Sequence, residues 1–370
     1  MKNFTIDDSS PVIRYTPNPT FAVNIFPDPL LNWSPVCGAI DASERCDDHS
    51  AHVTGLDGAK FALSFFGTGI NLFGNLTLGT TFSMNIDGNT VSNGLSGGEG
   101  ADSQILAKVS GLSPALHTLI LTVKKGEDIR GLFTFDYAQI LVGNATSFNR
   151  TVIDAFSDQL RLGPAEPRYL LVYPSFSAFS INSPRSEADN SHSSESWNRY
   201  GGYNASVPDG VNFSSFRATD VMGANVYAAF KGSTLFYYGP CYTASHAYTV
   251  SLDGGANSQP VQLNASVPFT QVVARCLRYY SGGLSTQISD SGSQIEHEIL
   301  ITNSQDKKWL TIHWLEMWDF QLVESTGIST GASPSSAITR IPHLHSTDGG
   351  GIVALLALTT VLYSIICHLF

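Results

Sequence analysis

An internal repeat constrains this chain more than any other feature of its sequence. Residues 52–74 align without a gap with residues 217–239, at a constant offset of 165 positions. The glycines coincide in these two segments, with Gly58, Gly67 and Gly74 falling on Gly223, Gly232 and Gly239. Three later segments match in the same order, namely MNIDG (84–88) with VSLDG (250–254), HTLILT (117–122) with HEILIT (297–302), and FTFDYAQI (133–140) with LTIHWLEM (310–317). The repeat predicts one fold used twice.

The repeated segments have the periodicity of β-strands. Large apolar side chains occupy alternate positions in three runs, which are Phe61, Leu63 and Phe65, then Leu119, Leu121 and Val123, then Phe133, Phe135 and Tyr137. A period of two places each run on one face of a sheet. Asp-Gly pairs at 87–88 and 253–254 predict hairpin turns, and Gly67 and Gly232 suit short turns between strands. We see no amphipathic helix of normal length, so the pattern predicts an all-β sandwich or jelly roll.

The length of 370 residues allows two hydrophobic cores. We expect a first sandwich at 3–143, a linker at 144–151 and a second sandwich at 152–323 with a polar surface loop at 183–215. A Ser/Thr/Gly-rich stalk at 324–351 and a hydrophobic tail at 352–370 complete the predicted organisation.

Charge argues against nucleic acid as a partner. Only 14% of the residues are charged and the formal net charge is -11, without a Lys/Arg cluster. Binding to phosphates depends on basic residues, so this composition predicts no nucleic-acid site.

Cysteines and sequons point to the secretory route. Each half contains one cysteine pair, which predicts the disulfides Cys37–Cys46 and Cys241–Cys276; four free thiols in a reducing compartment are the alternative. Candidate N-glycosylation sites are Asn3, Asn75, Asn144, Asn149, Asn204, Asn212 and Asn264. Asn32 also begins a sequon, but Pro35 makes it a poor acceptor.

The two ends give different signals. Residues 352–370 contain no Lys, Arg, Asp or Glu, and a helix of this length matches the hydrocarbon thickness of a bilayer. The tail fits a GPI-attachment signal, with Ser335 or Ser336 as the attachment point, or an uncleaved transmembrane helix. The first 15 residues lack the apolar stretch of a signal peptide. We favour a truncated start over two alternatives, a cytosolic protein with a post-translationally inserted tail and an insertion route directed by the tail.

Several of these segments resemble a family. The opening IDDSSPVIRY (6–15), the segment GAKFALSFFGTGINLFG (58–74), the NIDG turn and the strand FDYAQILV (135–142) resemble fungal, mainly basidiomycete, membrane-anchored surface proteins. The resemblance implies tandem galactose-binding-like β-sandwich domains on the cell surface. It is weaker in the second repeat, where VIDAFSD (152–158) stands for the opening. Most members of this family lack an assigned activity, so the resemblance implies fold and location more than function.

No residue constellation specifies a reaction. His297-Glu298 begins like the zinc-protease motif HExxH, but Ile301 occupies the position of the second histidine. His343 and His345 have no further ligands nearby in the sequence, so we predict no metal site, cofactor or catalytic residue. We interpret Asp7-Asp8 as a charged turn that caps the first strand, with Arg14 as a partner, rather than as a calcium or sugar site.

One loop is the candidate ligand surface. Trp33 lies in a Pro-rich segment beside the first cysteine pair and is the tryptophan expected to be exposed; the other aromatics predicted as core packing are Trp309, Trp314, Trp318, Tyr237, Tyr238, Tyr279 and Tyr280. The candidate ligand-binding residues are therefore Trp33, Asp47, Asp48, His49 and His52.

Three functions remain open. A non-enzymatic surface protein that binds glycans through loops at the end of a sandwich is the preferred hypothesis, by fold analogy alone. A structural coat glycoprotein without a specific ligand is the alternative, and a glycan-acting hydrolase is a third, which would need paired carboxylates.

Overall fold

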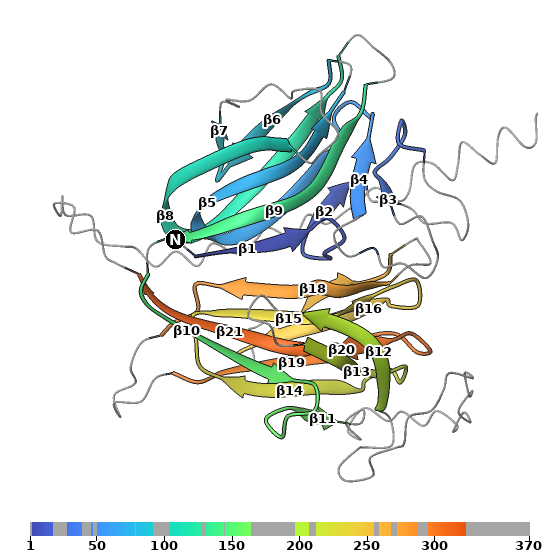
Figure 1. Ribbon diagram of the computed structural model, residues 1–370, viewed down its shortest axis with the longest axis vertical. Helices are drawn as coiled ribbons and strands as arrows, with labels where there is room; N and C mark the ends of the chain where they lie inside the picture. The colour runs from blue at the N-terminus through green and yellow to red at the C-terminus, as the bar shows by residue number, and fades with distance from the viewer. Residues whose placement is uncertain are drawn as a thin grey trace, which may run out of the picture. The chain divides into compact units, whose positions relative to one another are not determined.

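The computed structural model describes residues 2–17, 28–38, 46, 50–77, 79–91, 104–126, 131–143, 145–163, 197–206, 212–254, 259–267, 272–286 and 295–322. Within these residues every regular element is a β-strand (Figure 1), which confirms the all-β class. None of the described segments forms a helix able to cross a membrane. The expected stalk and C-terminal hydrophobic helix lie outside the described residues.

Residues 2–143 build one hydrogen-bonded sheet. Its strands are β1 (Lys2–Asp7), β2 (Arg14–Thr16), β3 (Ser34–Cys37), β4 (Ser50–Thr54), β5 (Lys60–Leu76), β6 (Thr81–Ile86), β7 (Asn89–Val91), β8 (Gln104–Lys124) and β9 (Phe133–Gly143). The strand order is β3-β4-β9-β5-β8-β6-β7, with β1 on β9 and β2 on β5. The long strands β5 and β8 bend, so their two ends belong to two layers (Figure 1).

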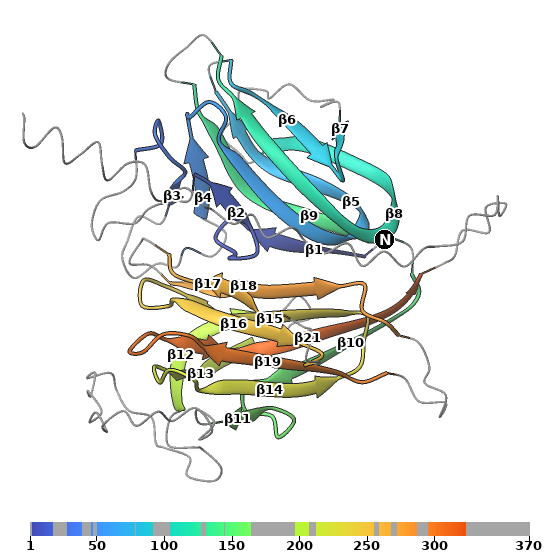
Figure 2. The same ribbon diagram turned by 180° about the vertical axis from the view of Figure 1, so that it is seen from behind.

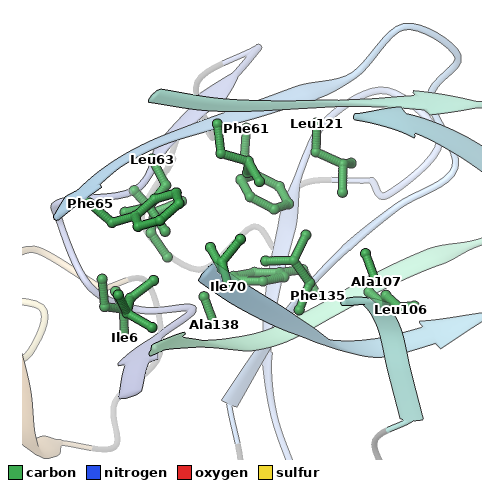
Figure 3. Packing of buried hydrophobic residues seen from close by; sticks show 14 of the residues in the cluster. Ile6, Phe61, Leu63, Phe65, Ile70, Leu106, Ala107, Leu121, Phe135 and Ala138 are labelled. Atoms are coloured by element: carbon green, nitrogen blue, oxygen red, sulfur yellow. The ribbon is translucent and has the colours of Figure 1, made fainter. Parts of the chain in front are cut away.

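Alternating apolar side chains hold these two layers together. Figure 3 shows Phe61 and Leu63 of β5 pointing toward Ile70 and Phe135, and all four are buried. The predicted alternation at Phe61, Leu63 and Phe65, and at Leu119, Leu121 and Val123, is confirmed. Burying each such side chain contributes roughly 2–3 kcal/mol of transfer free energy.

Residues 145–322 repeat the arrangement in shorter strands. These are β10 (Ala145–Asp154), β11 (Arg161–Gly163), β12 (Asn198–Ser206), β13 (Asn212–Thr219), β14 (Asn225–Phe230), β15 (Thr234–Cys241), β16 (Ala247–Leu252), β17 (Val261–Asn264), β18 (Val273–Gly282), β19 (His297–Asn303), β20 (Leu310–Ile312) and β21 (Trp314–Leu322). They form the sheets β10-β21-β15-β18, β11-β14-β19-β16-β17 and β12-β13-β20. Figure 2 shows β16, β19 and β14 side by side.

The repeat is visible strand by strand. At the offset of 165, the single strand β5 corresponds to β14 and β15 together, and the break lies at Gly232, whose φ is 148°. The matching Gly67 sits inside the bend of β5, where an added Cβ would lie 2.6 Å from the carbonyl oxygen of Leu141. Glycine is therefore required at both positions, although only Gly232 separates two strands as predicted.

The predicted hairpin turns carry identical side-chain contacts. Asp87 has a φ of 53° and Asp253 a φ of 52°. His117 Nδ1 lies 2.6 Å from Asp87 Oδ2, and His297 Nδ1 lies 2.8 Å from Asp253 Oδ2. In each turn the other carboxylate oxygen accepts a backbone N–H, from Thr118 in the first and Glu298 in the second. This recurrence is direct structural support for one fold used twice.

Both predicted disulfides are present. Cys37 is bonded to Cys46 and Cys241 to Cys276, with Cα–Cα distances of 5.7 and 5.6 Å. Cys46 is fully buried, and it packs in the hydrophobic cluster formed mainly by residues of the second half.

The domain boundaries are a prediction that the structure leaves open. Residues Met1–Val323 belong to one compact unit, yet no described sheet contains strands from both sides of position 144. The chain forms β10 where we expected a linker, and β12 with the start of β13 where we expected a polar loop. The two sequons in this segment led us to predict a linker, although its residues alternate as in a strand.

Candidate functional site

The predicted ligand loop is not an exposed surface where the structure describes it. Trp33 is fully buried, and its Nε1 donates a hydrogen bond of 3.0 Å to the carbonyl oxygen of Lys60. The expectation of an exposed Trp33 is therefore wrong. Trp197 in the second half is also buried, and its Nε1 donates to the carbonyl oxygen of Gly163. Both tryptophans thus pack in the interior with their indole N–H groups hydrogen-bonded to backbone carbonyl oxygens.

His52, the other described candidate, is also buried. Its Nδ1 lies 2.6 Å from Asp8 Oδ2, and its ring stacks on Tyr15 at a centroid distance of 4.1 Å. Ser50 Oγ donates to Asp8 Oδ1, and Asp7 Oδ1 lies 3.1 Å from the same hydroxyl. Asp47, Asp48 and His49 lie outside the described residues.

Asp8 does not form the predicted charged surface turn. It is 1% exposed, and its partner is His52 instead of Arg14. Burial raises the pKa of Asp8 to about 8, and burial lowers the pKa of His52 to about 3. Low polarizability around the pair disfavours both charged forms, so we infer a neutral carboxyl hydrogen-bonded to a neutral imidazole near pH 7.

This cluster does not have the geometry of a catalytic triad. A serine nucleophile needs a hydrogen bond to the base, whereas Ser50 Oγ donates to Asp8. No group of three or more metal-ligating side chains occurs in the described segments. The contacts of this cluster join the end of β1 with Tyr15 of β2 and with Ser50 and His52 of β4.

A different surface combines ring and amide chemistry. The outer face of the β9-β5-β8 layer, bordered by β1, carries two parallel rows of side chains. Strand register places Ile105, Phe73, Tyr137 and Asp7 in one row, called here the ring row. The next row contains Lys108, Asn71, Gln139 and Thr5, called here the amide row.

The ring row offers an apolar platform. Phe73 and Tyr137 stack with their centroids 4.3 Å apart and an interplanar angle of 15°. Both rings are half-buried, and Ile105 beside them is 43% exposed. Four strands at the usual spacing make this row roughly 14 Å long.

The amide row offers hydrogen-bonding groups. Asn71 Nδ2 donates to Gln139 Oε1 at 3.1 Å. Asn71 Oδ1 is buried and accepts no hydrogen bond from the residues that the structure describes. An orphaned buried amide oxygen costs about 1–3 kcal/mol, so this atom is a candidate acceptor for a ligand hydroxyl once the side chains that cover it move aside.

The same face of the second half is covered by the first half. Phe236 takes the place of Asn71, and its ring lies 4.8 Å from that of Phe4. Trp318 and Tyr280 also contact Phe4, at 5.6 and 5.0 Å. The stacked pair recurs there as Tyr238 and Trp314, 4.7 Å apart. The apolar version of the face is thus an internal contact, whereas in the amide version Lys108 and Thr5 are exposed around Asn71, which is 8% exposed.

A β-bulge explains why sequence reasoning missed this face. The alternation of Phe133 and Phe135 predicted Tyr137 on the same side, and that prediction is wrong. Gly74 pairs with Phe135 and Phe73 with Tyr137, so Asp136 is an extra residue that turns Tyr137 outward. The second half has the same irregularity at His313, where the strand is interrupted between the end of β20 and the start of β21.

Other predicted site residues are partly described. Asn3, Asn149 and Asn264 are exposed and Asn75 is half-buried, while Asn204 and Asn212 lie in β12 and β13. Asn144, Ser335 and Ser336 lie outside the described residues. Of the aromatics predicted as packing residues, Trp314, Trp318 and Tyr237 are buried, and Tyr238, Tyr279, Tyr280 and Trp309 are half-buried.

Comparison with known proteins gives weak likenesses. No protein-family model and no curated protein matches the chain. Among solved structures, it is similar to a family two carbohydrate esterase from Cellvibrio japonicus, with 14% identity and a TM-score of 0.25 over 38% of this chain and 33% of that one. The chain thus spans about a third of that esterase.

Two solved structures of carbohydrate-binding modules are also similar. The CBM36-1 domain of a multidomain xylanase from the hindgut metagenome of Trinervitermes trinervoides has 13% identity and a TM-score of 0.26, over 40% of this chain and 100% of that one. The tandem CBM22-1-CBM22-2 domain from Paenibacillus barcinonensis Xyn10C has 10% identity and a TM-score of 0.23, over 77% and 90%. Because these scores are far below 0.5, the fold rests on the sheets themselves.

Proposed function

We propose that this chain is a non-enzymatic surface protein that binds a neutral glycan on the outer face formed by the ring row and the amide row. The observation that carries the proposal is the unsatisfied Asn71 Oδ1 beside the stacked Phe73–Tyr137 pair. A sugar ring has an apolar face of C–H groups and an edge of hydroxyls. The first can make apolar contacts with the outward edges of the two stacked rings, and the second matches amide groups.

The contrast between the halves supports a polar ligand. Where this face packs against protein, its centre is Phe236; where it faces outward, the centre is Asn71. A protein partner would favour the apolar version, since a buried amide needs a hydrogen-bonding partner. The binding surface is therefore on a sheet face rather than in the sandwich-end loops that the sequence favoured.

Location belongs to the same proposal. The two disulfides fit an oxidising compartment. We place the domains outside the cell, held by the tail at 352–370, either through a GPI anchor at Ser335 or Ser336 or through a membrane span. The resemblance to fungal surface proteins supports this location. A coat glycoprotein without a specific ligand is the competing function.

Binding of the full chain to an array of immobilised neutral oligosaccharides tests the proposal. Tyr137→Ala should weaken binding about tenfold, equivalent to about 1.4 kcal/mol. Asn71→Leu should weaken it similarly, because the hydroxyl acceptor is lost while the surface stays folded.

Tyr227→Ala is the matched control, since Tyr227 is a half-exposed aromatic on β14, in a sheet of the second half. This variant should bind like the wild type. Equal binding by wild type and Tyr137→Ala, or no binding to any oligosaccharide, would favour the coat protein instead.

A further inference from the structure

One sequon, at Asn75, lies beside the proposed ligand face. Asn75 follows Phe73 by two residues on β5 and lies opposite Thr134 of β9. Leu76, the next residue, packs against the hydrophobic core. Asn75 therefore shares the outer face with Phe73, about 7 Å further along the strand.

The side chain at this sequon is partly accessible. Asn75 Oδ1 accepts the N–H of Leu76 at 2.8 Å, and the side chain is half-buried. In the described part of the chain, Nδ2 makes no hydrogen bond. An N-linked glycan starts at this nitrogen, so its first sugar begins one row away from the Phe73–Tyr137 pair.

Asn264 is exposed enough for glycosylation but has no aromatic ring pair beside it on its strand. It is exposed on β17, and Gln262 takes the position two residues before it. A glycan at Asn264 therefore has no stacked ring pair within the same distance along its strand.

We propose that an N-glycan on Asn75 lies on the ring row and controls access to it. The inference rests on the proposed glycan-binding function and on passage through the secretory route. The first sugar packs its C–H groups against the outward edges of the stacked Phe73–Tyr137 pair, and an outer hydroxyl reaches toward Asn71 Oδ1. The attached glycan then occupies the surface that an external glycan needs.

Tethering makes this competition effective. A short covalent link gives the attached sugar an effective concentration in the millimolar range or above. An external glycan of comparable intrinsic affinity must displace it. Glycosylation at Asn75 should therefore weaken binding of external neutral oligosaccharides by about three- to tenfold.

The experiment compares full chains secreted from a glycosylating eukaryotic host. Mass spectrometry of the peptide that contains Asn75 establishes occupancy, and array binding measures affinity. Asn75→Gln should bind an external oligosaccharide three- to tenfold more tightly than the wild type. Asn264→Gln should bind like the wild type. Unglycosylated wild type from a bacterial periplasm should match Asn75→Gln, which separates the sugar from the substitution.

A second readout does not depend on external ligand. Comparison of wild type with Asn75→Gln gives the rise in Tm caused by the glycan, and Tyr137→Ala should reduce this rise. An empty Asn75, equal affinities, or a rise in Tm unchanged by Tyr137→Ala would overturn the inference and leave the proposed function standing. If no form binds a neutral oligosaccharide, the proposed function fails. A rise in Tm that Tyr137→Ala removes would still support a glycan that lies on the rings.

Discussion

At the scale of single residues, Asp8 concentrates the unusual electrostatics of the first half. It accepts a hydrogen bond from Ser50, faces His52, and lies close to the carboxylates of Asp7 and Asp136. Since burial raises its pKa to about 8, the folded state holds a proton that the unfolded state has lost above the ordinary value of 3.8. The free energy of unfolding must therefore fall as pH rises through this interval.

Asp8→Asn should remove this dependence. Asparagine keeps an oxygen for Ser50 and supplies an N–H for His52 Nδ1 without titrating. Between pH 6.5 and 8, wild type should lose stability relative to Asp8→Asn by on the order of 1 kcal/mol per pH unit. His52 adds a smaller change of opposite sign near pH 6.5, because its ordinary pKa of 6.5 lies at the edge of this window while its folded pKa is about 3, and the comparison of wild type with Asp8→Asn largely cancels it. Urea unfolding at pH 6.5, 7.2 and 8 measures the difference.

Asp87→Asn is the control, because the pKa of Asp87 is shifted in the opposite direction from that of Asp8. Burial raises the pKa of Asp87, but hydrogen bonds from His117 and from the backbone of Thr118 outweigh it and lower the pKa below 3.8. Its contribution is lost only as pH falls through the acid range, so Asp87→Asn should not change the slope above pH 6.5. A wild-type curve parallel to that of Asp8→Asn would mean that Asp8 is ionised in the folded protein.

At the scale of elements, the hairpins were predictable and the bulge was not. Asp87-Gly88 closes the two-residue turn between β6 and β7, with both residues at positive φ. At 253–254 only the aspartate takes positive φ, and the pairing of β16 with β17 begins further on, at Val250 and Val261. The extra residue Asp136 carries no such signature, since any residue type can occupy a bulge. Its role emerges only from a tertiary contact, in which its carbonyl oxygen accepts the N–H of Asp8 at 2.9 Å. The sequence therefore predicts the strands of the candidate site but not which face Tyr137 occupies.

The hairpin after β16 gives a test of these turn contacts. Asp253→Ala removes the partners of His297 Nδ1 and of the Glu298 N–H, and places a Cβ-bearing residue without compensation at a φ of 52°. We expect a loss of about 1–3 kcal/mol of unfolding free energy. Asp253→Gly should lose about 1 kcal/mol less, because glycine adopts this φ without strain. Equal losses in the two variants would show that backbone strain has no part in the effect.

At the scale of the whole chain, the repeat indicates that one fold is used twice but not how the copies combine. The offset of 165 matches each strand of the first half with its counterpart in the second. It gives no information on which residues of the two halves are in contact. The structure shows Phe236, Leu277, Trp318 and Phe320 in the hydrophobic cluster of the first half. Tyr280 adds hydrogen bonds, since its hydroxyl accepts the N–H of Phe66 at 2.9 Å and donates to the carbonyl oxygen of that residue.

These shared contacts predict that both halves unfold together. Phe4 is 8% exposed and its ring contacts Phe236, Trp318 and Tyr280, so the aromatic cluster of the second half loses its cover when this one side chain is removed. Phe4→Ala should lower the unfolding free energy by about 3–5 kcal/mol. Tryptophan fluorescence during urea unfolding reports on both halves, since Trp33 is buried in the first and Trp314 and Trp318 are buried in the second. Phe82→Ala, within the first core, is the comparison: if the halves are coupled, both variants shift the same single transition, whereas two transitions with an unshifted second step would show that each half unfolds alone.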